Sequence, residues 1–196
     1  MASSHALIGY WDAAPPEAGR VGAVVLGALA PFADTLAFTA KGEAVSGAPE
    51  AAASRLPGID REPGWMAELP GGPTLAFGER RACAVSLDYH VGLMDDPGGA
   101  EAGLRAAAAA LVTAGGAALA WVTAVPTEHA GAQVEDAARV FCGRGRGARL
   151  PARRLTAHAH LVAWRIGAWA DERPHLRAGG ACFWLGEAAR RGPVRR

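Results

Sequence analysis

Three residues with the side chains of a hydrolase triad, Ser86, Asp88 and His90, lie close together in the segment SLDYH. In such a triad a histidine base activates a serine nucleophile, and a carboxylate orients the histidine. The spacing argues against this chemistry, because side chains two apart on a strand stand side by side, whereas a triad aims its base at a nucleophile on a turn. The sequence also lacks the G-x-S-x-G motif of that turn. We therefore interpret the three residues as a polar strand surface.

Histidines at metal-ligand spacing form the second candidate. His158 and His160 make an H-x-H pair, and His175 follows further along the chain. A structural or catalytic zinc needs a third and a fourth ligand, and neither an H-E-x-x-H motif nor a carboxylate pattern lies nearby. The sequence therefore predicts no metal site, no cofactor and no enzymatic activity.

The segment CGRGRGARLPARR invites a phosphate-binding interpretation, because glycines expose backbone N–H groups and arginines fork onto phosphate. It lacks G-x-x-x-x-G-K-[ST] and has no aromatic residue between its arginines on which a base could stack. We interpret it as a surface loop. A nucleic-acid-binding module that uses this loop, residues 144–154, remains the alternative; its arginines are Arg144, Arg146, Arg149, Arg153 and Arg154.

Cysteine usage and hydropathy indicate a cytoplasmic protein without a membrane segment. Three widely spaced cysteines, an odd number, suit a reducing compartment better than a disulfide scaffold. The first residues lack the basic and apolar regions of a signal peptide. The longest apolar stretch, residues 21–33, is interrupted by glycine and proline and is too short to cross a bilayer.

The net charge of +1 conceals a difference between the two halves of the chain. Residues 1–101 hold 13 acidic and 6 basic residues, hence −7, and residues 102–196 hold 6 acidic and 14 basic residues, hence +8. Such a division can steer a charged partner toward one part of a molecule. The alternative is that the fold interleaves the two halves so that their charges cancel.

The elements that must position these residues follow from apolar periodicity and turn signals. We expect a strand over residues 5–10, then Asp12 as N-cap of a helix whose apolar face runs from Val21 to Leu36 and which Pro31 kinks or splits. A proline- and glycine-rich connecting region follows at about 43–73, pinned to the body by Trp65. Further along we expect a hairpin (74–77 and 82–93, with a turn near 78–80), helices over 100–114 and 132–141, and strands over 117–125, 160–170 and 180–185.

In the second strand of the hairpin, Val85, Leu87 and Tyr89 alternate with the three polar residues. The order of elements predicts an α+β fold with a mainly antiparallel sheet and helices packed on it, in one domain spanning 1–196. Trp164 and Trp169 lie an odd number of residues apart, so a regular strand would send them to opposite faces and expose one of them.

The chain resembles the immunity protein 52 family in four places: Tyr10-Trp11, the helical segment with Leu29 and Phe32 that leads to Gly42, the strand ACAVSLDYHVGL, and HLVAWRIGAW followed by AGGACFWLGE. The family has glycine after Tyr-Trp where this chain has Asp12, and its aromatic residue near Phe38 is loosely matched. The resemblance covers most of the chain. It implies a small cytoplasmic α+β protein that neutralises a nuclease toxin with a restriction-endonuclease-like domain, delivered by a type VI or related secretion system.

Under that resemblance the chain acts by occlusion, with a cognate protein toxin as partner. Nuclease toxins are basic around the substrate cleft, so an acidic surface on the inhibitor favours fast association. The expected contact residues are the strand-face and turn residues Glu79, Asp88, His90, Asp95 and Asp96, with Trp169 as an aromatic anchor. A small enzyme of unrecognised type, which would need an ordered pocket around a perturbed histidine or cysteine, is the remaining alternative.

Overall fold

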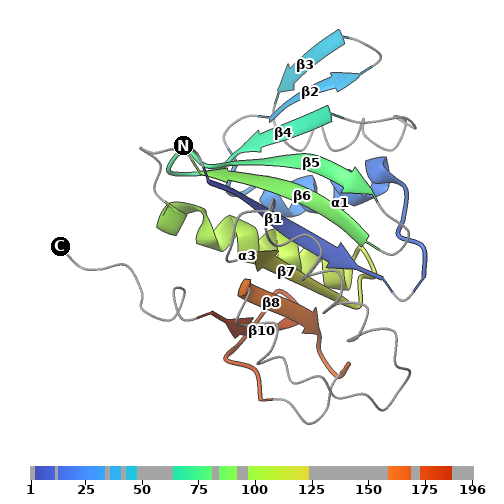
Figure 1. The fold of residues 1–196 in the computed structure, drawn as a ribbon, viewed down its shortest axis with the longest axis vertical. Coiled ribbons are helices and arrows are strands. Elements are labelled where there is room, and N and C mark those ends of the chain that lie inside the picture. The colour runs from blue at the N-terminus through green and yellow to red at the C-terminus, as the bar shows by residue number, and fades with distance from the viewer. Residues whose placement is uncertain are drawn as a thin grey trace, which may run out of the picture.

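Ten strands form one antiparallel sheet in the computed structural model, which describes residues 3–11, 13–33, 36–40, 43–47, 64–80, 84–91, 97–123, 159–168 and 173–186 (Figure 1). The strands are β1 (Ser3–Tyr10), β2 (Leu36–Ala40), β3 (Glu43–Gly47), β4 (Gly64–Glu68), β5 (Thr74–Arg80), β6 (Ala84–Val91), β7 (Leu119–Thr123), β8 (Ala159–Arg165), β9 (Leu176–Ala178) and β10 (Ala181–Leu185). Their spatial order is β3-β2-β4-β5-β6-β1-β7-β8-β10-β9. The predicted α+β fold is therefore confirmed.

Two helices, α1 (Ala18–Leu29) and α3 (Pro97–Thr113), contact each other and lie behind the sheet in Figure 1. We call the sheet face they cover the helix face. Buried side chains of both helices join the main core there, among them Val25 and Leu29 of α1 and Leu111 of α3, which share it with Leu87 of β6. Because side chains alternate along a strand, every strand also presents residues to the opposite side, which we call the second face.

The second face carries its own buried cluster over β1, β7, β8 and β10. Cross-strand pairing joins Tyr10 to Leu119 and Leu119 to Trp164, so these side chains form one row across three strands. Trp121 pairs with Val162 in the neighbouring row. The remaining members of this cluster are Ala159 and Cys182.

Tyr10 and Trp11 close strand β1 by packing on opposite sides of the sheet. Tyr10 belongs to the cluster on the second face, whereas Trp11, 5% exposed, packs into the main core. The Trp11 indole N–H donates a hydrogen bond to the carbonyl oxygen of Gly115 at 2.9 Å. Both aromatic residues therefore have a structural role, and Trp11 ties the end of β1 to the end of α3.

The Trp11 ring also explains a glycine in β1. A Cβ added at Gly9 would lie 2.8 Å from Cη2 of Trp11. We expect Gly9→Ala to lower the free energy of unfolding by about 1–3 kcal/mol, because the ring must move out of a packed core. Urea unfolding measures this. Gly27→Ala is the control: Gly27 lies inside α1 with nothing within 4 Å, and alanine there should stabilise the protein by about 0.5–1 kcal/mol.

Arg80 at the end of β5 holds the loop that leads into α1. Its Nη2 donates to the carbonyl oxygen of Pro15 at 2.8 Å and its Nε to that of Pro16 at 3.3 Å. We expect Arg80→Ala to cost about 1–2 kcal/mol in urea unfolding, through the loss of two charge-assisted hydrogen bonds. Glu17→Ala should cost less than about 0.5 kcal/mol, because its ion pair with Arg80 spans 3.8 Å and the Glu17 side chain is 77% exposed. Equal losses of stability in Arg80→Ala and Glu17→Ala would contradict the role of the two carbonyl hydrogen bonds in holding this loop.

Helix α3 ends just before two consecutive glycines, Gly115 and Gly116. Gly116 adopts a positive φ of 72°, and the N–H of Ala117 donates to the carbonyl oxygen of Leu111 at 2.9 Å, so the last turn closes with a left-handed cap. The strand and helix predictions for the segments over 74–93, 100–114 and 117–125 are confirmed apart from their bounds, although β5 continues through the residues expected to turn, Gly78 to Arg80. The predicted helix over 132–141 lies outside the described residues.

Three predictions about the first half of the chain are wrong. Helix α1 begins at Ala18 with Glu17 as N-cap, so Asp12, outside the described residues, does not occupy the N-cap position. The helix ends at Leu29, before Pro31, and the residues from Leu36 form strand β2, which pairs with β3 and β4, instead of continuing the helix. The connecting region at 43–73 contains β3 and β4, although Trp65 is buried as predicted.

Candidate functional site

The polar side chains of the central strands gather on the second face of the sheet, away from α1 and α3. In β6, Leu87 and Tyr89 point into the core and the half-buried Ser86 and Asp88 lie on the other side with the exposed His90. Strand β4 follows the same alternation: Trp65 and Ala67 are buried, while Met66 and Glu68 are exposed, Met66 by 45%. Alternation along β6 is therefore as predicted, and β4 adds two residues that the sequence reading did not select.

Strand register brings these residues together. Glu68 pairs with Thr74 of β5, and Thr74 pairs with His90 of β6, so the three form one row across the sheet. Met66, Ala76 and Asp88 form the next row in the same way. Cross-strand partners share a face and their Cβ atoms lie about 4.5–5.5 Å apart, so the two rows are neighbours on one continuous surface.

Glu79 shares this surface through a bulge in β5. The register shifts between Phe77 and Glu79, after which Glu79 pairs with Ser86, a residue of the second face. The structure describes Glu79 by its backbone alone, so its strand position is what places it on this face. We name the set Met66, Glu68, Glu79, Asp88 and His90 the acidic face.

Gly78 at the bulge leaves space for the Asp88 carboxylate. A Cβ at Gly78 would lie 2.9 Å from Oδ1 of Asp88 and 3.0 Å from the carbonyl oxygen of Ser86. Glycine therefore lets the strand pass close to the carboxylate, which is half-buried at the centre of the acidic face. Any larger residue at this position would push Asp88 away from its present place.

The other predicted contact residues are not placed. Asp95, Asp96 and Trp169 lie outside the described residues, as does the arginine-rich loop 144–154. Met66 and Glu68 were missed because the prolines and glycines around them favoured a connecting region. The signal that could have found them is the period-two pattern WMAEL, in which apolar and exposed positions alternate over five residues.

Among the described residues, the charges of the two halves of the chain also lie in different parts of the sheet, except that Glu101 of the acidic half lies on helix α3 and is counted with the second part. Strands β1 to β6 occupy one half of the sheet, and β7 to β10 occupy the other. The described acidic residues of the first half are Glu17, Glu43, Glu68, Glu79 and Asp88, against Arg20 and Arg80; in the second half Glu101 stands against Arg105, Arg165, Arg173 and Arg177. The strand order therefore keeps the two halves apart rather than interleaving them.

Neither the triad nor the metal candidate is assembled in the described part of the chain. Ser86, Asp88 and His90 are strand neighbours spaced about 6.6 Å apart along β6, as side-by-side positions require. No group of three or more histidine, cysteine, aspartate or glutamate side chains close enough to hold a metal ion occurs among the described residues. His158 lies outside them, and the Nδ1 of His175 accepts the backbone N–H of Leu185.

Comparison with known proteins identifies no relative. The chain matches no protein family, no curated protein and no solved structure. Within the described residues, no helix has the length and apolar character needed to cross a membrane.

Proposed function

We propose that the chain is an immunity protein that binds a nuclease toxin through the acidic face and neutralises it by occlusion. The observation that carries the proposal is the register of β4, β5 and β6, which places Glu68, Asp88 and His90 on one side of the sheet together with the exposed Met66. The resemblance of the sequence to immunity protein 52 supplies the class of partner.

Electrostatics supports a nuclease as partner. A nuclease cleft must hold a phosphate backbone and is therefore basic, so it attracts an acidic protein surface. The acidic face lies in the half of the sheet formed by the acidic half of the chain, which extends the attraction beyond the contact residues. Charge of this kind raises the rate of association and selects among partners.

Met66 supplies an apolar contact beside this charge. Glu68 follows it by two residues on the same face of β4, and Asp88 lies in the same row as Met66 across β5, so a partner would meet one exposed thioether beside carboxylates. Methionine is enriched at protein interfaces, where its flexible side chain adapts to an irregular pocket. A basic cleft that contains an apolar pocket would complement both features.

The experiment begins with capture of the partner on the immobilised chain and its identification by mass spectrometry. The captured protein is then expressed in a laboratory bacterium with and without this chain. Growth arrest that the chain prevents, together with DNA or RNA degradation that it stops, would support the proposal. Arrest and degradation that continue in the presence of the chain, or a partner without nuclease activity, would contradict it.

A further inference from the structure

The carboxylate of Asp88 is partly withdrawn from solvent and has no partner within the described part of the chain. Its side chain is half-buried, whereas that of Glu68 is exposed. No described residue forms an ion pair or a hydrogen bond with it. A carboxylate that has lost part of its hydration without gaining an internal partner gains more from an outside cation than a fully hydrated one does.

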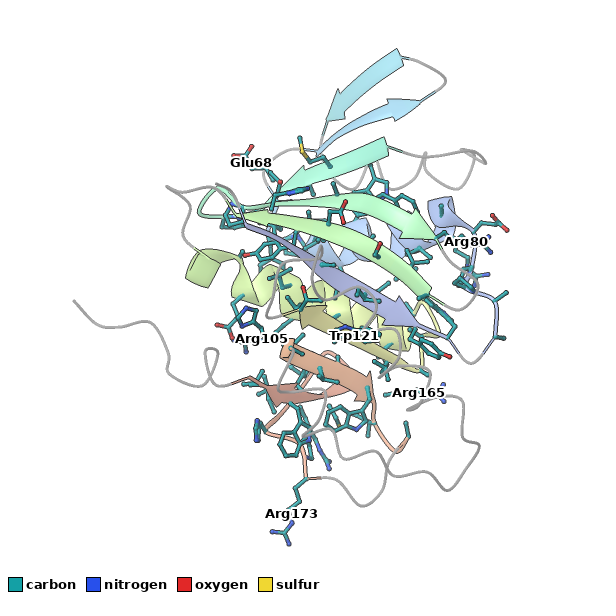
Figure 2. The ribbon with its side chains drawn as sticks, viewed as in Figure 1. Glu68, Arg80, Arg105, Trp121, Arg165 and Arg173 are labelled. Atoms are coloured by element: carbon teal, nitrogen blue, oxygen red, sulfur yellow. The ribbon has the colours of Figure 1, made fainter. Side chains whose placement is uncertain are left out.

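Arg80, which follows Gly78 by two residues, does not neutralise Asp88. It pairs with Val85, a core residue of the helix face, and it donates to the carbonyl oxygens of Pro15 and Pro16. Figure 2 shows Arg80 at the far end of β5, away from Glu68. The nearest described arginine along β5 is therefore committed to the loop before α1.

The row that contains Asp88 leaves room for an incoming side chain. Its cross-strand partners are two alanines, Ala6 of β1 and Ala76 of β5, and Met66 follows beyond Ala76. Two strand spacings, about 9.6 Å, separate the positions of Met66 and Asp88. An arginine that lies across Ala76 would pack its apolar stem beside the Met66 thioether and pair its planar fork with the carboxylate.

Gly78 sets the place of this carboxylate. It is the extra residue of the β5 bulge, since Phe77 pairs with Leu87 and Glu79 already pairs with Ser86. Oδ1 of Asp88 lies 2.9 Å from the position that a Cβ of residue 78 would occupy. Bulges commonly change the direction of a side chain beside a functional site. Here the bulge lets the carboxylate lie against the backbone of β5.

We propose that Gly78 is a positioning residue, which sets the Asp88 carboxylate to receive one arginine side chain of the partner. The inference rests on the proposed function and adds to it that the place of this carboxylate, beyond its charge, holds the complex together. Long-range charge acts mainly on the rate of association, whereas a desolvated contact acts on the rate of dissociation. The two contributions can therefore be separated by kinetics.

Two variants move the carboxylate without changing the charge of the protein. In Gly78→Ala the new methyl group displaces it, and in Asp88→Glu one more methylene carries it outward. Binding of the captured nuclease is followed by surface plasmon resonance at about 150 mM salt. We expect both variants to dissociate about 5- to 30-fold faster, as the loss of a charge-assisted contact predicts, and to associate within about twofold of the unmodified rate.

Each variant has a matched control. Gly47→Ala adds a methyl group to another strand glycine, at a position with nothing within 4 Å. Glu68→Asp moves an exposed carboxylate of the acidic face by one methylene. Both controls should change the dissociation rate less than about twofold. Circular dichroism and urea unfolding establish that all four variants are folded.

A double-mutant cycle shows whether Gly78 acts through Asp88. In the background Asp88→Asn the guanidinium contact is already weakened, so adding Gly78→Ala should change the dissociation rate less than about twofold. An undiminished effect of Gly78→Ala in that background would give the glycine a purely structural role and overturn the proposal.

Two other results would overturn the proposal while leaving the proposed function in place. One is unchanged dissociation in Gly78→Ala and Asp88→Glu, and the other is equally faster dissociation in Glu68→Asp. In both cases the unmodified protein still inhibits the nuclease. Failure of the unmodified protein to inhibit the captured nuclease is a different outcome, which contradicts the proposed function and this inference together.

Discussion

Replacing Trp11 with alanine should lower the free energy of unfolding by about 3–5 kcal/mol. The side chain is 5% exposed, fills the core between the end of β1 and α3, and donates a hydrogen bond to the carbonyl oxygen of Gly115. Its removal leaves a cavity and a carbonyl without its donor. Because small domains are stable by only about 5–15 kcal/mol, this loss should move the midpoint of urea unfolding to a much lower concentration.

Two controls make the Trp11 result specific. Ile166→Ala removes a large apolar side chain that is 49% exposed and should cost less than about 0.5 kcal/mol. Trp11→Phe keeps an aromatic ring but loses the indole N–H, so it should cost an intermediate amount, with about 1 kcal/mol from the hydrogen bond. Loss of less than about 1 kcal/mol in Trp11→Ala would contradict the role of this residue as the tie between β1 and α3.

Reversing charge on the acidic face should slow association with the toxin by about 10- to 100-fold at low salt. The double variant Glu68→Lys/Asp88→Asn changes the charge of this surface by three units and keeps the shape of residue 88. Surface plasmon resonance with the captured nuclease measures the association rate. The difference from the unmodified protein should shrink as salt approaches about 0.5 M, because screening shortens the range of the field.

Glu17→Lys is the matched control for this experiment. Glu17 is an exposed glutamate in the same half of the chain but lies beside Arg80 at the start of α1, outside the acidic face. It should slow association less than about threefold. If Glu17→Lys slowed association as much as the single variant Glu68→Lys, which makes the same change in charge, net charge rather than the acidic face would be responsible.

Local sequence patterns predicted the part of the acidic face that lies on β6. Val85, Leu87 and Tyr89 alternate with Ser86, Asp88 and His90 over enough residues for the period to be read, and the structure confirms both sides of the strand. The end of α3 was predictable for a similar reason, since consecutive glycines stop an alanine-rich helix.

The contribution of β4 was not predictable in the same way. Its five residues lie among prolines and glycines, and their strand conformation depends on pairing with β5 and also with β2, a strand that the sequence pattern did not predict. The bulge at Gly78 likewise depends on the approach of Asp88 from the neighbouring strand. The three-residue β9 has too few positions to show any period, so only its pairing with β10 defines it.

The separation of charge could be read from the sequence, but the arrangement of the two halves in the sheet could not. The count for each half says nothing about whether the strands of the two halves alternate in the sheet. The order β3-β2-β4-β5-β6-β1-β7-β8-β10-β9 answers this, since only the β1–β7 pair joins the halves within the sheet.

The measurement that tests the proposed function most directly is a titration of the purified partner nuclease with this protein. Cleavage of its nucleic-acid substrate is followed as the ratio of the two proteins rises. The proposed function predicts that cleavage stops near one equivalent of the unmodified protein, and that Glu68→Lys/Asp88→Asn requires a large excess. Cleavage that continues at saturating concentrations of the unmodified protein would contradict it.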